Sequence, residues 1–62
     1  MFRPTMTTIL RRNGATLSDL TPAALVDAAL AALGSEGTPW ATPAWRPALV
    51  ALAAEVLAEE QG

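Results

Sequence analysis

The sequence of 62 residues contains no cysteine, histidine, lysine or tyrosine, so every basic side chain is an arginine. Without cysteine, neither a disulfide nor a thiolate metal site can form. Without histidine, lysine or cysteine, no side chain is present that would activate a serine or threonine nucleophile. These absences exclude most protein-only active sites, and we expect that the chain is not an enzyme.

Carboxylates are the remaining candidates for chemistry. Glu55 and Glu59 lie four residues apart on one side of a predicted helix, a spacing that two acid–base groups could use. A glutamate pair near the end of a helix is far more commonly a solvated face, and we adopt that interpretation. The sequence contains no zinc, calcium or phosphate-loop pattern. We therefore predict no catalytic residue, no metal, no cofactor and no small-molecule substrate.

Long apolar runs are also missing. The richest apolar stretch, residues 47–58, is interrupted by Glu55 and is shorter than the roughly 20 residues that a membrane span needs. The N-terminus carries Arg3 but lacks the apolar run of a secretory signal peptide. We expect a soluble, cytoplasmic protein with no membrane partner.

Apolar residues make up 52% of the chain, but fourteen of them are alanines, which leaves few larger side chains for a core. This composition predicts one small domain over residues 1–62. We expect it to be mostly α, as a two-helix hairpin with an extended N-terminal arm that could form a short strand. The predicted parts are a basic arm at 1–16, a first helix in 18–33, a Pro/Trp-rich linker at 34–46 and a second helix at 47–60.

The first predicted helix has clear start and stop signals. Thr21 is a suitable N-cap and Pro22 suits the first helical position. Leu20 and Leu25 have the spacing of a hydrophobic staple around that cap. Gly34 is a natural stop, so the regular helix should cover residues 22–33. Its apolar face would consist of Leu25, Val26, Ala29, Leu30 and Leu33.

The second predicted helix should begin close to Pro47. Thr42 and Pro43 repeat the cap-and-proline pattern of the first helix, but a helix that began there would place Pro47 inside it. A turn at residues 43–46 before the helix resolves this conflict. The apolar face would consist of Leu49, Val50, Leu52, Ala53, Val56 and Leu57.

The N-terminal segment allows two interpretations. Residues 5–12 have a strand-like composition, and Asn13-Gly14 is a strong hairpin signal with residues 15–17 as a short return strand. In the alternative, Asn13-Gly14 closes a short N-terminal helix. We predict a short strand or extended arm.

The linker contains both tryptophans, and Trp45 is followed by Arg46 and Pro47. Tryptophan and arginine are enriched at binding hot spots, so Trp40, Trp45 and Arg46 could form a docking surface. Alternatively, the tryptophans fold back as lids and supply apolar area that alanine-rich helices lack. In a third arrangement, one tryptophan ring packs on the core and the other is exposed.

Charge is distributed unevenly, because Arg3, Arg11 and Arg12 lie in residues 1–16 and every acidic residue follows them. A basic arm before two helices is similar, in the order of its elements, to ribbon-helix-helix repressors and antitoxins. That resemblance implies an N-terminal strand in the DNA major groove, read by Thr8, Leu10 and Arg12 or by Thr7, Ile9 and Arg11. The sequence departs from it at Asn13-Gly14 and in its long linker.

We therefore predict a non-enzymatic protein–protein interaction module. It would be an assembly, docking or accessory subunit of a larger complex, or a homodimeric helical adaptor. Its Leu and Val stripes would be buried against the partner, with Trp40 and Trp45 as anchors and the arginines of the arm on an acidic surface. The alternative is a small DNA-binding regulator, which the net charge of −2 disfavours.

Overall fold

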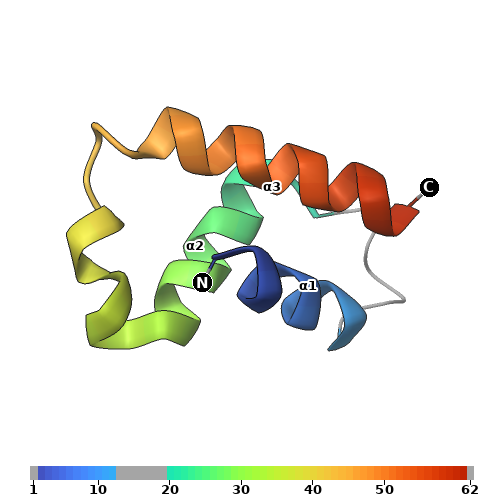
Figure 1. Cartoon of the computed structure of the whole chain (residues 1–62), viewed down its shortest axis with the longest axis horizontal. Coiled ribbons are helices and arrows are strands. Elements are labelled where there is room, and N and C mark those ends of the chain that lie inside the picture. Colours follow the sequence, from blue (N-terminus) through green and yellow to red (C-terminus); the bar gives the residue numbers. More distant parts are fainter. Residues whose placement is uncertain (1, 13–19, 62) are drawn as a thin grey trace.

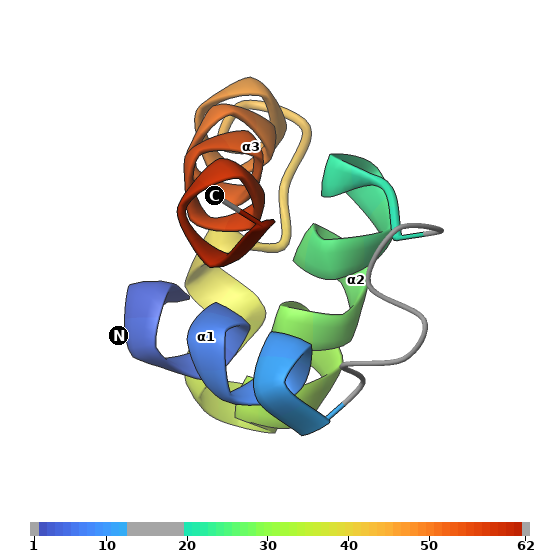
Figure 2. The same cartoon turned by 90° about the vertical axis from the view of Figure 1, so that its right-hand side faces the viewer.

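The computed structural model describes residues 2–12 and 20–61. These residues form three α-helices, α1 (Phe2–Arg12), α2 (Pro22–Leu33) and α3 (Arg46–Gln61), with the 3₁₀-helix η2 (Gly34–Trp40) after α2 (Figure 1). The mostly α prediction is confirmed. The two-helix hairpin is not, because α1 packs against both other helices and all three surround a common centre (Figure 2).

The predicted strand or extended arm is wrong for residues 2–12, which are helical. Phe2, Met6 and Leu10 recur every four residues, so a helix places all three on one side, where they are buried. Their burial outweighs the strand propensity of the threonines. Within this helix the Thr8 hydroxyl donates to the Pro4 carbonyl oxygen at 2.9 Å. The predicted hairpin turn at 13–14 and return strand at 15–17 lie outside the described residues.

The signals for α2 act as predicted. The Oγ1 atom of Thr21 accepts a hydrogen bond from the backbone N–H of Ala24 at 3.1 Å, and Pro22 occupies the first turn. At the other end Gly34 has φ 59° and ψ −129°, and its N–H donates to the carbonyl oxygen of Leu30. The positive φ is the reason that this helix ends at a glycine.

The start of α3 also agrees with the sequence. A turn over residues 42–45 precedes the helix, and Pro47 lies in the first helical turn, where its missing N–H costs nothing. The segment predicted as a plain linker is partly helical, because η2 occupies residues 34–40.

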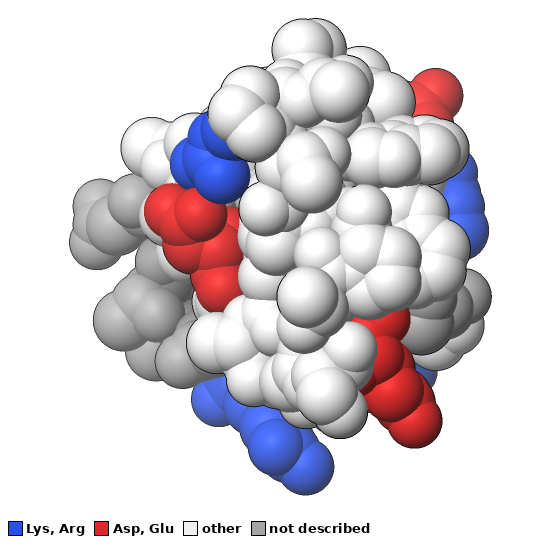
Figure 3. Space-filling view, turned by 90° about the vertical axis from the view of Figure 1, so that its left-hand side faces the viewer, with Lys and Arg blue, Asp and Glu red and all other residues white. Residues whose placement is uncertain are grey.

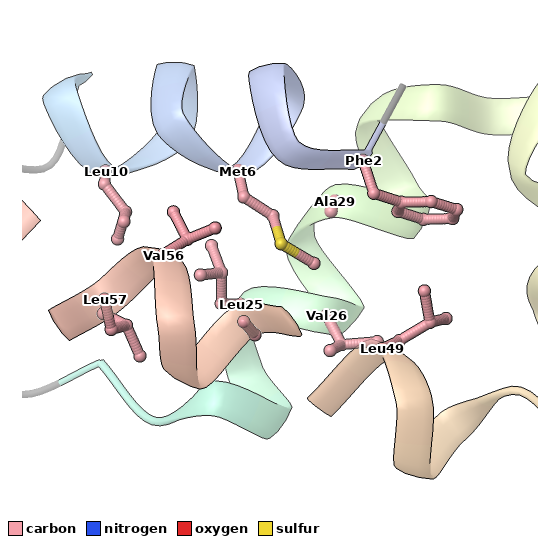
Figure 4. Close-up of a cluster of buried hydrophobic side chains, with 10 residues drawn as sticks. Phe2, Met6, Leu10, Leu25, Val26, Ala29, Leu49, Val56 and Leu57 are labelled. Carbon is pink, nitrogen blue, oxygen red and sulfur yellow. The ribbon is translucent and has the colours of Figure 1, made fainter. Parts of the chain in front are cut away.

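The core lies between the three helices, and each contributes side chains that point toward the others (Figure 4). Both predicted apolar faces are confirmed, since every member is buried or half-buried. The residues buried in the core are Phe2, Met6, Leu10, Leu25, Val26, Ala29, Leu49, Ala53, Val56 and Leu57.

This core corrects the predicted mode of docking. The Leu and Val stripes of α2 and α3 are largely covered by each other and by α1, so they do not form the continuous surface for a partner that the sequence predicted. No helix in residues 2–12 or 20–61 is long and apolar enough to cross a membrane.

Candidate docking surface

The segment between α2 and α3 holds both tryptophans in fixed positions. Gly37 is buried in η2, and a Cβ atom there would lie only 3.1 Å from the Cβ of Leu33. Two backbone hydrogen bonds hold the segment that follows η2. The Ala41 N–H donates to the Thr38 carbonyl oxygen at 3.1 Å, and the Trp45 N–H donates to the Thr42 carbonyl oxygen at 3.2 Å. The two indoles therefore project from a hydrogen-bonded segment rather than from an open loop.

The two tryptophans have different surroundings. Trp40 is half-buried and packs against the core, with its ring 5.8 Å from the ring of Phe2 at an interplanar angle of 81°. Trp45 is 48% exposed, the one large apolar side chain of the described residues with that degree of exposure. Its ring lies 6.5 Å from Trp40 at 64°, also an edge-to-face contact. Trp40 is thus placed as a lid, and Trp45 is placed as a surface residue.

A concave site, which we call the linker pocket, lies beside Trp45. Its volume is about 350 Å³, within the range of about 300–1,000 Å³ that is common for binding pockets. Most of the lining residues are apolar, and the polar ones are a threonine and an arginine. The lining residues are Val26, Leu30, Trp40, Ala41, Thr42, Pro43, Arg46 and Leu49.

Arg46, a predicted partner-binding residue, lines this pocket and also pairs within the chain. Its Nη1 atom lies 2.9 Å from Oδ1 of Asp27 on α2, with both side chains well exposed. The hydrogen bond to Asp27, followed by the attraction of its charge, raises the pKa of Arg46 above its usual range. The pair links the first turn of α3 to the middle of α2 at one side of the pocket.

Two arginines of the predicted basic arm are paired with the C-terminal part of α3. Nη1 of Arg3 lies 2.7 and 2.8 Å from the two carboxylate oxygens of Glu59, and Glu55 is 3.6 Å from Nη2. The hydrogen bond to Glu59 raises the pKa of Arg3. Nε of Arg11 lies 3.2 Å from Glu60. The acidic surface that these arginines reach belongs to the chain itself.

Arg12 is exposed at the end of α1 and has no ion pair among the described residues. The structure therefore separates the predicted partner-binding residues into groups. Trp40, Trp45 and Arg46 lie together around the linker pocket, whereas Arg3, Arg11 and Arg12 lie on α1.

The end of the molecule that carries η2 and the turn before α3 is largely free of charge. In Figure 3 uncharged side chains cover the centre of this face, and the charged side chains lie around its edge. We call this surface the tryptophan face and define it by Trp45, the exposed residues 41–44 and the linker pocket. Uncharged apolar surface with a polar rim is typical of a protein interface.

The described residues provide little else for chemistry. No group of three or more acidic side chains in residues 2–12 and 20–61 could hold a metal ion. The groove beside α1 that contains Arg3 and Arg11 also contains Glu59, so the nearby positive charge is offset.

Sequence reasoning found the tryptophans but missed Phe2 and the α2 side of the pocket. Phe2, Met6 and Leu10 have the spacing of a helix face, and this pattern was the available signal for α1. Val26 and Leu30 were assigned to the core face of α2, and no sequence pattern indicates that they also line a pocket with residues 41–43.

Comparison with known proteins gives no relative: no family model, no curated protein and no solved structure matches this chain.

Proposed function

We propose that this chain is a non-enzymatic protein–protein interaction module that docks through its tryptophan face. The observation that supports the proposal is the position of Trp45, half-exposed beside a mostly apolar pocket on a face whose centre carries no charge. A partner that covers the exposed half of the Trp45 indole removes apolar surface from water, which stabilises the complex by roughly 25 cal/mol per Å² covered. Partly exposed tryptophans beside concave apolar surface are the usual anchors of interfaces.

Preorganisation also supports docking at this face. Trp45 rests edge-to-face on Trp40, and Trp40 rests on Phe2 in the core. The indole at the surface is thus connected to the core by two ring contacts, so binding would order few additional side chains. Exposed aromatic residues on a flexible loop would bind less tightly for the same contact area.

DNA binding has weaker support. The ribbon-helix-helix comparison needs an N-terminal strand, and residues 2–12 are helical instead. Arg3 and Arg11 already donate to carboxylates of α3, so contact with phosphate would first require these pairs to break.

Site-specific photo-crosslinking tests the proposal. A benzophenone amino acid replaces Trp45 in one variant and Ala58 in a control, since Ala58 is exposed on the C-terminal part of α3. Irradiation of cells that produce the chain should give a discrete protein adduct from position 45 and none from position 58. Equal adducts from both positions, or none from position 45, would show that the tryptophan face is not a docking surface.

A further inference from the structure

We infer that the partner of the tryptophan face is a second copy of this chain, with Trp45 of each copy inserted into the linker pocket of the other. This inference rests on the proposed function and adds the identity of the partner. It requires a protruding side chain, a pocket that accepts it and a geometry that makes the exchange reciprocal.

Trp45 is a suitable protruding group because its position is already fixed. Its backbone N–H donates to the Thr42 carbonyl oxygen, and its carbonyl oxygen accepts from the Leu49 N–H at 3.0 Å. Its ring lies against Trp40. A side chain that is held in one orientation loses little conformational entropy when it inserts into a partner.

The linker pocket has the chemistry that an indole needs. Its wall is mostly apolar, and Trp40 contributes an aromatic surface on which a second indole can pack edge-to-face. A buried indole N–H requires a hydrogen-bond acceptor, and Thr42, whose side chain carries a hydroxyl group, is among the lining residues. The volume of about 350 Å³ leaves room for a large side chain.

The closeness of the two features favours a second copy over an unrelated protein. Trp45 directly precedes Arg46, which lines the pocket, and Trp40 belongs both to the pocket wall and to the ring contact with Trp45. Because protrusion and pocket lie side by side on one face, a twofold rotation can bring each protrusion onto the pocket of the other copy. A twofold interface of this kind is the commonest arrangement in homo-oligomers.

Charge and area agree with this arrangement. Two identical faces place like groups near one another, so a charged face would repel its copy, whereas the centre of this face carries no charge despite the net charge of −2. A standard interface buries about 800 Å² per partner, which is about a fifth of the 3821 Å² that the chain exposes.

Sedimentation equilibrium over micromolar to millimolar concentrations tests the inference on the full chain. The wild type should form a reversible dimer of twice 6.4 kDa. Trp45→Ala should raise the dimer dissociation constant about 30-fold or more, as loss of a hot-spot residue does. Ala41→Glu, which places a charge in the pocket, should have a similar effect, while the matched change Ala58→Glu on α3 should leave the dimer intact.

Crosslinking between isotope-labelled and unlabelled chains identifies the contact. With the benzophenone at position 45, mixed-isotope dimers should form, and the crosslink should map to the pocket lining of the other copy. A monomer at all concentrations, a dimer that tolerates both Trp45→Ala and Ala41→Glu, or a crosslink elsewhere would overturn the inference. If position 45 crosslinks in cells only to a different protein, the docking function stands and self-association is wrong. If it crosslinks to nothing, both proposals are wrong.

Discussion

At the scale of single residues, the difference between the two tryptophans comes from the ring that each one touches. Trp40 lies between Phe2 and Trp45, so it belongs to the fold and to the tryptophan face at the same time. The ring of Trp45 contacts Trp40, and 48% of the surface of Trp45 stays exposed. The sequence places both residues in one linker and contains no signal that assigns them to different roles.

Substitution of each tryptophan should separate these roles. We expect Trp40→Ala to lower the free energy of unfolding by about 2 kcal/mol, less than a fully buried aromatic residue because Trp40 is half-buried. Trp45→Ala should lower it by less, about 1 kcal/mol at most, through loss of the edge-to-face contact with Trp40. Urea unfolding at low micromolar concentration, where self-association contributes least, measures both values. An equal loss in the two variants would mean that Trp45 is also a lid.

Gly34 gives a second prediction at this scale. Its φ of 59° is unfavourable for an L-residue, and a Cβ atom added there meets no heavy atom within 4 Å. Gly34→Ala should therefore lower the free energy of unfolding by about 1–3 kcal/mol through backbone strain alone. A chain of 62 residues is accessible to chemical synthesis, so D-alanine can serve as the control. D-alanine accepts positive φ and should leave stability unchanged or raised, and equal effects of the two enantiomers would argue against strain.

At the scale of elements, helices with local start and stop signals were predictable and α1 was not. Thr21, Pro22 and Gly34 define α2 without reference to the rest of the chain. The stability of α1 depends on the partners of Met6 and Leu10 in α2 and α3, because a helix this short is marginal alone. The linker pocket was hidden for the same reason, since its wall combines α2 with the turn before α3.

Two Thr-Pro pairs with different roles provide a test of the helix cap. Thr21 accepts a hydrogen bond from the N–H of Ala24, so Thr21→Ala should lower the free energy of unfolding by about 1 kcal/mol. Thr42 is also followed by a proline, but it begins a turn, and its backbone carbonyl oxygen accepts from the Trp45 N–H. Thr42→Ala should therefore have little effect in the same urea titration. A larger loss at Thr42 than at Thr21 would contradict this assignment.

At the scale of the whole molecule, apolar burial rather than ion pairing holds α1 against the other helices. Met6 is fully buried among the three helices, so Met6→Ala should lower the free energy of unfolding by about 2–5 kcal/mol. The Arg3 pair with Glu59 is exposed, and exposed ion pairs contribute little to stability, so Arg3→Gln should have a small effect that vanishes in high salt. Urea titrations at low and high salt compare the variants. If Arg3→Gln lowered the free energy of unfolding more than Met6→Ala, ion pairing rather than apolar burial would hold α1 against the other helices.

The residue types that the chain lacks determine how its stability responds to alkaline pH. Histidine, cysteine, tyrosine and lysine are the side chains that titrate between about pH 6 and 11, and none is present. Arginine is therefore the one side chain of this sequence that titrates at alkaline pH. Pairing with carboxylates raises the pKa of Arg3 and Arg46 in the folded state. The stabilisation from a raised folded-state pKa is complete below the unfolded-state pKa of arginine and is lost only as the pH rises through the folded-state value.

We therefore expect a flat profile of unfolding free energy from about pH 8.5, above the titration of a terminal amine, to about pH 11. Urea midpoints at several pH values across this range measure it, with the slope of each titration checked for constancy. A decline within the range would require a titrating group whose folded-state pKa lies there, and the side chains of this sequence do not include one. Such a decline would overturn the assignment of the arginine pairs as permanently charged.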